Sequence, residues 1–515
     1  MNDAYVTATF VICIFILAGC ASIVPSTHHL KEPLQKSSFN AYNPLSSPLS
    51  LPYLEELRDI TKSGAMLISD GSYALLHRAT LARMAKYSIE IQTYIYKNDI
   101  ASQVLMHEIW QAANRGVQIK ILVDDNGLDS DYSDIIALNN HPNIEVRIFN
   151  PYRNRIKLFR LSEMVLDFKR VNRRMHNKMF IVDGIALIVG GRNIADNYFD
   201  NTLGVNFSDT DAFFLGQVAK EAQESFKEYW EYHRSIPVEF LPSKRKMKKF
   251  LKNYSKVIQE LESDTGEWQK YHDVMQVFID NYQHKKNKIY WGNGVLVADS
   301  PEKIDAKNPT SKILAQLTKI LENVTDSVYI SSAYFVPGKK SFEGIKESMQ
   351  KGINYFILTN SLSSTDVLAV YSAWERYRDK LVKINANIYE YRKSEGTIKI
   401  RGKVSSGASL HSKIFVFDNK ISCVGSFNLD PRSSVINTEV VAIFDNEEFA
   451  KEMTKLIQID MQKAWKLKRI NNKTTWCAYD DESDNKTLCF THSPDTSWWV
   501  RFVSVLAKIM PENQM

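Results

Sequence analysis

One motif that occurs twice constrains this chain more than any other feature. Each copy has a histidine, one residue, a lysine, four residues and an aspartate, and then, after six intervening residues, a glycine, a small residue, one further residue and an asparagine. The copies consist of His176, Lys178, Asp183 and Asn193, and of His411, Lys413, Asp418 and Asn428. They lie 235 positions apart, and a repeat of this kind predicts two copies of one domain.

The repeat extends beyond the motif. Residues 89–96 alternate like a strand, residues 100–113 have helical spacing and end at Gly116, and residues 117–123 form a second strand-like run. The second half repeats this order at 328–336, 342–349, Gly352 and 353–359. Strand, helix and strand in alternation predict an α/β fold, in which each domain is a mixed, largely parallel sheet flanked by helices. We expect a pseudo-twofold relation between the domains and an active site at their interface.

The composition admits several classes of partner. A chain of 515 residues with 44% hydrophobic content can fill two or three cores. The formal net charge of +6 and the isoelectric point near 8.7 suit an anionic partner such as lipid headgroups or nucleic acid. No basic tract dominates the chain, so this indication is mild.

The N-terminus differs from the rest. Residues 6–17 are almost entirely apolar and lead into Leu17-Ala18-Gly19-Cys20, which resembles a bacterial lipoprotein signal in which Cys20 is lipidated. The first five residues contain no Lys or Arg, a departure from such signals. The short apolar run favours a cleaved signal over a spanning helix, although an uncleaved anchor stays open. We expect a protein of the bacterial cell envelope, associated with a membrane and anchored through Cys20.

Composition changes along the chain define the predicted segments. A stretch rich in Ser, Pro and Asn follows the signal and suits a tether, and a highly charged helical stretch separates the two halves. The predicted division is 1–20 for the signal, 21–53 for the tether, 54–242 for the N-terminal domain, 243–295 for a charged helical insertion, 296–470 for the C-terminal domain and 471–515 for a tail.

The tail and the cysteines leave alternatives open. The segment that begins at Trp498-Trp499 is amphipathic, and it suits a headgroup layer and a helix docked on the body equally well. Cys477 and Cys489 flank an acidic loop and are as consistent with a disulfide as with two free thiols. The five cysteines form no metal-ligand pattern, so we predict neither a metal nor another cofactor.

Side-chain direction divides the motif into two parts. Residues two apart on a strand share a face, so His176 and Lys178 point one way and Asp183, at an odd offset, points the other. Asp183-Gly184 and Asp418-Asn419 are typical of hairpin turns, so we expect these aspartates to form turns. A single His-X-Lys pair is usually an ordinary surface feature, but two copies at the same spacing favour catalysis.

Two such halves together can carry out displacement at a phosphodiester. One neutral histidine would attack phosphorus to form a phosphohistidine, and the other would protonate the leaving alkoxide. Lys178, Lys413, Asn193 and Asn428 would neutralise charge on the phosphoryl oxygens.

Each histidine should also have a carboxylate at its far ring nitrogen, to fix the tautomer and raise basicity. The candidates are Asp211 and Glu439, which precede strand-like apolar runs, and Asp209 competes with Asp211 for the same role.

These motifs resemble the phospholipase D superfamily, whose hallmark is the duplicated His-X-Lys-X4-Asp pattern, over residues 54–470. Within it, residues 122–126, 172–178, 189–194 and 207–211, together with the N-terminal signal and the Trp-Trp tail, are similar to the bacterial cardiolipin synthase C type. Gly191 stands where the second copy has Ser426, so any hydroxyl contact to phosphate comes from Ser426 alone.

The resemblance implies a metal-independent transfer of a phosphatidyl group through a histidine. Transfer to phosphatidylglycerol would give cardiolipin, and transfer to water would give phosphatidic acid. The resemblance favours His176 as the nucleophile, and the subtype implies phosphatidylethanolamine as a donor. Two rivals stay open, a phosphodiesterase acting on nucleic acid and a lipid-binding scaffold without activity. An exported, lipidated enzyme would meet little nucleic acid, so we do not expect that substrate.

Overall fold

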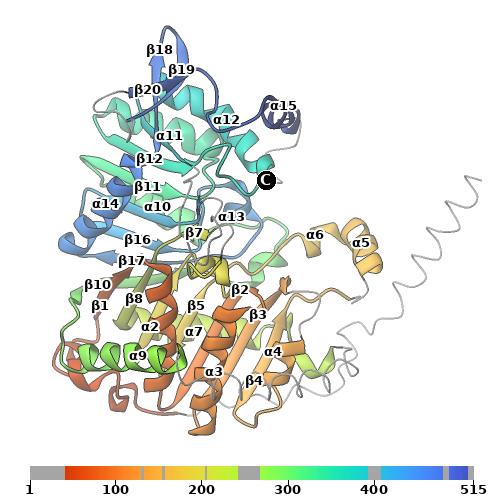
Figure 1. Ribbon diagram of the computed structural model, residues 1–515, viewed down its shortest axis with the longest axis vertical. Helices are drawn as coiled ribbons and strands as arrows, with labels where there is room; N and C mark the ends of the chain where they lie inside the picture. The colour runs from red at the N-terminus through yellow and green to blue at the C-terminus, as the bar shows by residue number, and fades with distance from the viewer. Residues whose placement is uncertain are drawn as a thin grey trace, which may run out of the picture.

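The computed structural model describes residues 41–128, 133–153, 157–202, 206–241, 267–392, 408–479 and 487–508. Figure 1 shows two α/β halves stacked along the long axis, with the N-terminal half below and the C-terminal half above. The predicted signal with Cys20, most of the tether and the basic run at 244–249 lie outside the described residues.

The N-terminal half alternates strands and helices as the sequence predicts. Its elements are β1 (Lys62–Ile68), α2 (Gly71–Met84), β2 (Ser88–Tyr96), α3 (Ile100–Asn114), β3 (Gln118–Leu128), α4 (Ser133–Leu138), β4 (Ile144–Phe149), α5 (Lys157–Leu166), α6 (Phe168–Val171), β5 (Met179–Val182), β6 (Ala186–Gly190), β7 (Asn206–Ser208), β8 (Asp211–Gly216), α7 (Gln217–Glu231) and β9 (Ser235–Pro237). The helix α9 (Glu267–Gln283) follows and packs on this half through the buried side chains of Met275, Ile279 and Tyr282.

The C-terminal half repeats this plan and adds an extension. Its elements are β10 (Tyr290–Ala298), α10 (Lys312–Leu321), β11 (Ser327–Ser332), α11 (Gly338–Gln350), β12 (Asn354–Asn360), α12 (Leu368–Lys383), β13 (Asn387–Tyr391), β14 (Ala408–Leu410), β15 (Lys413–Phe417), β16 (Ile421–Gly425), α13 (Pro431–Val435), β17 (Val440–Asp445), α14 (Glu447–Gln462), β18 (Trp465–Ile470), β19 (Lys473–Tyr479), β20 (Thr487–Phe490) and α15 (Trp498–Ala507). The predicted domain boundary at 295 lies inside β10.

A single sheet runs through both halves. Following its pairings from edge to edge, the order is β9-β4-β3-β2-β5-β6-β8-β1-β10-β17-β16-β15-β11-β12-β13-β18-β19-β20. The order reads the same outward from the antiparallel pair β1 and β10, because β8 corresponds to β17, β6 to β16, β5 to β15 and β2 to β11. This correspondence of strands is the pseudo-twofold relation that the sequence predicts.

The mixed α/β sheet is confirmed, but its parallel part is smaller than expected. Only β2, β3 and β4, and their counterparts β11, β12 and β13, pair in parallel among the strands of this sheet that the structure describes. The remaining pairings are antiparallel, and two of them, β5 with β6 and β15 with β16, are the tight hairpins of the two motifs. Gly116 (φ 94°) and Gly352 (φ 97°) end α3 and α11 in the left-handed conformation, as their repeated spacing indicates.

The two halves share one hydrophobic core. Buried side chains of β5, β6, β8 and α7 pack with those of β15, β16, β17 and α14 in a single cluster. At its centre the rings of Phe214 and Phe444 lie 5.7 Å apart. A core built from both halves fixes the position of one motif relative to the other, which a site shared between the motifs requires.

The predicted tether ends earlier than position 53. Leu49 and Tyr53 are buried against the N-terminal half, and the Ser47 hydroxyl donates a 2.6 Å hydrogen bond to the Asp183 carboxylate. Residues 41–53 are therefore part of the folded body, because their apolar side chains contribute to its core.

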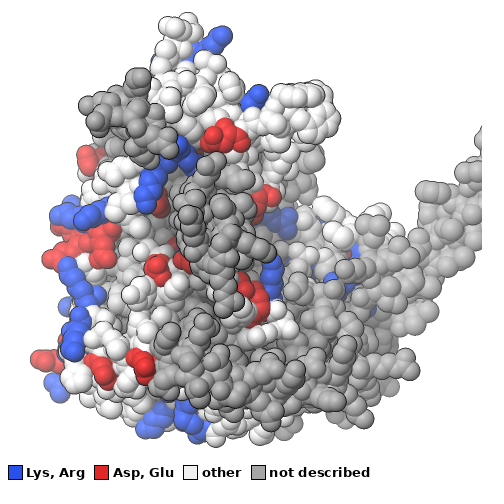
Figure 2. Space-filling model, viewed as in Figure 1, with Lys and Arg blue, Asp and Glu red and all other residues white. Residues whose placement is uncertain are grey.

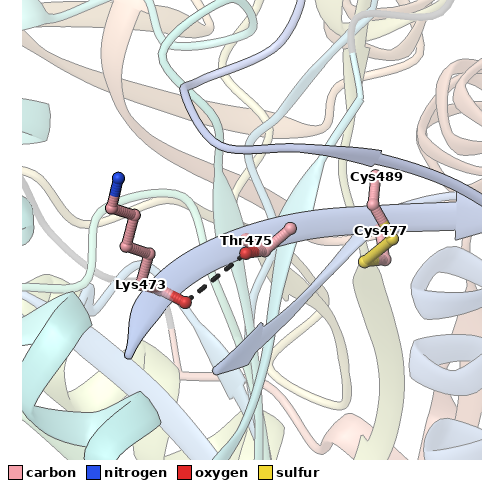
Figure 3. Close-up of a disulfide and its surroundings, with 4 residues drawn as sticks. All are labelled: Lys473, Thr475, Cys477 and Cys489. Atoms are coloured by element: carbon pink, nitrogen blue, oxygen red, sulfur yellow. Dashed lines mark hydrogen bonds between the residues drawn. A yellow bond between two sulfur atoms is a disulfide. The ribbon is translucent and has the colours of Figure 1, made fainter. Parts of the chain in front are cut away.

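The tail forms two additions to the C-terminal half. Cys477 and Cys489 lie opposite each other on β19 and β20 and form a disulfide (Figure 3), which resolves the alternative left open by the sequence. The same view shows the Thr475 hydroxyl near the carbonyl of Lys473 at the start of β19, at 3.4 Å. The helix α15 docks on α12. Among the described residues, no helix is both long enough and apolar enough to span a membrane.

Candidate active site

Each motif is a strand, a tight turn and a returning strand. The turn residues Asp183 (φ 52°) and Gly184 (φ 57°), and likewise Asp418 (φ 50°) and Asn419 (φ 53°), have the two left-handed conformations that a type I′ turn requires. The Asp183 carboxylate accepts hydrogen bonds from the backbone N–H groups of residues 86, 87 and 88, and that of Asp418 accepts from residues 325, 326 and 327. Each aspartate thus joins its hairpin to the start of the neighbouring strand, far from the histidine.

His and Lys of each motif stay together at the opposite end of the hairpin. The Lys178 ammonium donates a 2.8 Å hydrogen bond to the carbonyl of His176, and the Lys413 ammonium makes the same bond to the carbonyl of His411. Both lysines are almost fully buried, with 3% and 1% of their surface exposed. Asn193 and Asn428 are buried just past the ends of β6 and β16, and the Asn193 side chain accepts a 3.0 Å hydrogen bond from the Ile95 N–H.

Each histidine takes its carboxylate from the opposite half of the molecule. The His176 Nδ1 lies 2.9 Å and 3.0 Å from the two oxygens of Glu439, and the His411 Nδ1 lies 2.6 Å from Asp209. A carboxylate on Nδ1 fixes the proton there and turns Nε2 toward the substrate. Neither half can therefore assemble a complete histidine dyad on its own.

Short parallel pairings between the halves produce this exchange. The His176 N–H donates to the carbonyl of Thr438 at 2.9 Å, immediately before Glu439. The His411 N–H donates to the carbonyl of Ser208 at 2.7 Å, immediately before Asp209, where β14 pairs in parallel with β7. The backbone register alone thus places each carboxylate beside the partner histidine.

The prediction of Asp211 as a histidine partner is wrong, and its competitor Asp209 holds that position. Asp211 begins β8 opposite Gly190, and its carboxylate pairs with Arg78 at 2.8 Å and with Arg192 at 3.4 Å. The second copy has fewer residues between the motif asparagine and the carboxylate than the first, so the equivalence of Asp209 and Glu439 is not visible from motif spacing.

The difference between Gly191 and Ser426 also has a structural reason. The Ser426 hydroxyl donates a 2.5 Å hydrogen bond to Glu439, so it supports the carboxylate and is not directed at a phosphate as we expected. A Cβ at Gly191 would lie 2.3 Å from the Asp209 carboxylate. The shorter aspartate brings its own carboxylate into the space that the serine side chain occupies in the other half.

Burial lowers the pKa values of the motif histidines and lysines, and so sets which of them are charged in the site. Burial lowers the pKa of His176 to about 4, against the influence of Glu439, and lowers the pKa of His411 well below its usual value. Burial also lowers the pKa of Lys178 to about 7. Both imidazoles are thus neutral at neutral pH in the empty site, and a bound anion would raise the pKa of every one of these groups.

The pKa values of the two carboxylates shift in opposite directions. Burial opposes ionisation of Glu439, but His176, Lys178 and Ser426 together hold its pKa below the usual value. Burial raises the pKa of Asp209, and the lysines and Arg192 only partly oppose this effect. Glu439 is therefore the more firmly ionised partner.

Aromatic rings border both histidines, which the sequence did not indicate. The ring of Tyr94 meets the edge of His176 at 5.0 Å between centroids, and Tyr198 and Phe207 lie 5.1 Å and 5.0 Å from His411. Such rings exclude water and restrict the imidazoles to one orientation.

One further polar residue holds the backbone just before each histidine. Asp124 accepts from the Met175 N–H at 2.9 Å, and Asn360 bonds both the N–H and the carbonyl of Leu410 at 3.0 Å and 2.8 Å. They follow the buried runs of β3 and β12, and polar residues at the carboxyl ends of parallel strands are the signal that could have identified them. Within the described ranges, no three His, Cys, Asp or Glu side chains are grouped so as to hold a metal ion.

Several known proteins are similar to this chain in sequence. The family described as "Cardiolipin synthase, PLD-like domain" matches residues 79–230 and 317–461. Cardiolipin synthase C of Escherichia coli (strain K12) is 34% identical over 473 residues, which are 85% of this chain and 93% of that protein. An uncharacterized protein of Helicobacter pylori (strain ATCC 700392 / 26695) is 46% identical over 98% of both chains.

A solved structure supports the same fold. The phosphatidylserine synthase of Haemophilus influenzae Rd KW20 superposes with a TM-score of 0.54 at 12% identity, over 81% of this chain and 92% of that one. The regions that match the family model contain both motifs and the strands that carry them. The chain therefore belongs to the cardiolipin synthase family of phospholipase D-like proteins, and its relatives place it among the phospholipid phosphatidyltransferases.

Proposed function

We propose that this protein is a metal-independent phosphatidyltransferase that makes cardiolipin through a phosphohistidine intermediate. The observation that carries the proposal is the pair of histidines whose Nδ1 atoms are each held by a carboxylate of the opposite half. This arrangement leaves both Nε2 atoms for one substrate, and the buried Lys178 and Lys413 supply positive charge for its phosphate.

In the first step His176 attacks the phosphorus of a donor phospholipid. The bond between Nε2 and phosphorus forms as the bond to the donor's headgroup alkoxide breaks. His411 gives that alkoxide its Nε2 proton, so the headgroup leaves as an alcohol. The negative substrate phosphate raises the pKa of His411 and so supplies the protonated form that burial alone disfavours.

The environment of the two histidines supports His176 as the nucleophile. Its partner Glu439 has a lowered pKa, whereas burial raises that of Asp209. An ionised carboxylate on Nδ1 increases the basicity and nucleophilicity of Nε2. The hydroxyls of Ser426 and Ser433 also donate to Glu439 and hold it in place.

In the second step the intermediate transfers its phosphatidyl group to an alcohol. His411, neutral after the first step, removes the proton of an acceptor hydroxyl as its oxygen attacks phosphorus, and the bond to His176 breaks. With phosphatidylglycerol as acceptor the product is cardiolipin, and with water it is phosphatidic acid. Phosphatidylglycerol and phosphatidylethanolamine are the proposed donors.

Expression in cells that lack their own cardiolipin synthases tests the reaction. Lipid mass spectrometry should detect cardiolipin with the wild-type protein and none with His176→Ala or His411→Ala at equal protein levels. The purified protein should keep its activity in EDTA. Formation of phosphatidic acid alone would identify a phospholipase D, and absence of both lipids together with plasmid nicking would identify a nuclease. Absence of every product would support a lipid-binding scaffold.

The proposed location is the bacterial cell envelope, with an anchor at Cys20. The residues before and at Cys20 suit lipidation, and two similar proteins are named as synthases of phospholipids, cardiolipin and phosphatidylserine, which supports a site of action at a membrane. Labelling with radioactive palmitate should mark the wild-type protein and not Cys20→Ala. Equal labelling of both proteins would contradict the anchor without affecting the proposed chemistry.

A further inference from the structure

The docking of α15 reverses the usual arrangement of an amphipathic helix. Its polar side faces the protein, where Ser504 is 1% exposed and its hydroxyl bonds Ser372 and Glu375 of α12. Lys508 adds a 3.1 Å ion pair to Glu375, and Arg376 donates to the Lys508 carbonyl. Polar contacts therefore hold this helix in place.

The apolar side of α15 faces outward. We call its side chains the α15 patch, and they are Trp498 (69% exposed), Trp499 (56%), Phe502 (46%), Val505 (57%) and Leu506 (49%). Amphipathic helices of globular proteins normally bury this side in the core. Figure 2 shows uncharged atoms over the place where α15 protrudes.

The helix α5, in the other half, also exposes apolar side chains, at its C-terminal end. Glu163, 8% exposed, accepts a 3.0 Å hydrogen bond from the Arg153 N–H and pairs with Arg170 on its inner side. Its outer side and the start of α6 carry the α5 patch, which consists of Met164 (45% exposed), Val165 (74%), Leu166 (63%) and Phe168 (49%). Two helices from different halves thus leave apolar faces uncovered, and Figure 1 shows both at the same side of the molecule.

Both helices rest on chain segments that lead to the active site. The α5–α6 pair runs directly into the backbone before His176, and Asn150 fixes that connection by donating to the carbonyls of Arg170 and Arg173. The α15 patch is carried on the first turns of α12, which follow Asp366, a carboxylate close enough to His411 to influence its pKa. One patch is therefore connected to each histidine.

The charges around the patches suit an anionic lipid surface. The helix α15 contains Arg501 and no acidic residue. Lys169 is exposed on α6, whereas Glu163 and Asp167 are both paired with Arg170. Tryptophans beside cations are the side chains that prefer the interface between lipid headgroups and acyl chains.

We propose that the α5 patch and the α15 patch together seat the protein on a phospholipid bilayer, one on each half of the active site. A bilayer can receive both patches at once because it needs only apolar area and headgroup charge, and no contact specific to one sequence. The choice of phospholipid as partner rests on the proposed function.

Hydrogen exchange on His176→Ala protein tests the surface without any turnover. With vesicles of phosphatidylethanolamine and phosphatidylglycerol, the amides of α5 and α15 should exchange about threefold or more slowly than without vesicles, as expected for helices that enter an interface. Those of α9, which lies at the opposite side in Figure 1, should be unchanged. Equal exchange of α5 and α15 with and without vesicles would overturn the proposal, and so would equal slowing of α9, because the bilayer would then not select these helices.

Turnover on vesicles and on monomeric lipid distinguishes membrane binding by the two patches from the chemical steps. Trp498→Ser/Trp499→Ser and Val165→Ser/Leu166→Ser should each lose about tenfold or more in turnover on vesicles, because less apolar area enters the bilayer. Both should keep turnover of short-chain phosphatidylglycerol dispersed as monomers within twofold of wild type. The control Val274→Ser/Val277→Ser removes two exposed valines of α9 and should retain both activities.

The outcomes distinguish the two proposals. Equal losses on vesicles and monomers would overturn the seating surface, and so would full activity of both patch variants on vesicles. A wild-type protein inactive on both substrates would contradict the proposed function, and the exchange experiment would still decide the surface.

Discussion

Around His176 the carboxylate is Glu439, supported by two serine hydroxyls, whereas around His411 it is Asp209, placed beside a glycine. The backbone is the same in both places, since each histidine N–H donates to the residue before the carboxylate of the opposite half. The difference lies in side-chain length and in the direction of the pKa shift. Glu439 has a lowered pKa and Asp209 a raised one, so a symmetric backbone presents two histidines with different partners.

This difference gives each histidine its own task in our account. A reaction through a phosphohistidine needs one nucleophile and one acid, and two identical half-sites would not distinguish them. The lowered pKa of Glu439 favours attack by His176, and the raised pKa of Asp209 suits His411 to the exchange of protons. Substitutions made in one half of the site at a time test whether the two histidines have different tasks.

The largest effect is expected from the histidines themselves. His176→Ala and His411→Ala should each lower kcat about 10³-fold or more, as removal of a nucleophile or a general acid does. A donor with an acidic phenol as leaving group needs little protonation, so it should restore the first step in His411→Ala and not in His176→Ala. A burst of released phenol measures this difference, and an equal burst in both variants would contradict the division of tasks.

The carboxylates should have smaller and unequal effects. Glu439→Gln should lower kcat/KM about 10³-fold and Asp209→Asn about 10²-fold, because an amide no longer stabilises the correct tautomer and Glu439 contributes the greater charge. Asp211→Asn is the matched control, since its carboxylate pairs with Arg78 and should affect stability more than turnover. A larger loss in Asp209→Asn than in Glu439→Gln would assign the nucleophile to His411.

Exchange of the glycine and the serine tests whether each carboxylate depends on its neighbour. Gly191→Ser should lower activity about tenfold because the added Cβ lies 2.3 Å from the Asp209 carboxylate. Ser426→Gly should cost only a few-fold, since it removes one donor to Glu439. The pair Asp209→Glu/Gly191→Ser imitates the other half, and a double-mutant cycle should show recovery of activity. Strict additivity would contradict this dependence.

The pH profile should differ between the empty and the occupied site. The pKa of Lys178 is lowered to about 7, so this side chain loses its charge as the pH rises through that value, and kcat/KM should fall above it. His176, with its pKa near 4, must be neutral to attack, so the acid limb of kcat/KM should lie near pH 4. The bound phosphate raises both values, and kcat should therefore keep its plateau to higher pH. Identical alkaline limbs in kcat and kcat/KM would contradict this reading.

The smallest effect on catalysis is expected from the turn aspartates. Each carboxylate accepts four hydrogen bonds, but Asp183 is fully buried whereas Asp418 is half-buried. Asp183→Asn should therefore cost about 2–3 kcal/mol of stability and Asp418→Asn about half as much, with little change in the specific activity of folded protein. Denaturant unfolding measures the first quantity. A fully stable but inactive Asp183→Asn would show that the aspartate takes part in the chemistry.

Local sequence patterns predicted the repeated strands, the hairpin turns and the pairing of His with Lys, because these depend on residues close in the chain. The exchange of carboxylates was not predictable from them, since it arises from parallel pairings between segments more than two hundred residues apart. Asp211 looked as suitable as Asp209 because both precede one apolar run, and only the register of β8 with β6 separates them. The polar docking side of α15 likewise became visible only with α12 beside it.

Identification of the phosphorylated histidine tests the central claim most directly. Wild-type protein and His411→Ala should be mixed with the donor carrying a phenol leaving group, quenched with base within milliseconds and digested, and the peptides analysed by mass spectrometry. Our account predicts a phosphatidyl group on His176 in both proteins, with longer persistence in His411→Ala because no base activates the acceptor. A phosphatidyl group found on His411, or on neither histidine while cardiolipin forms, would contradict it.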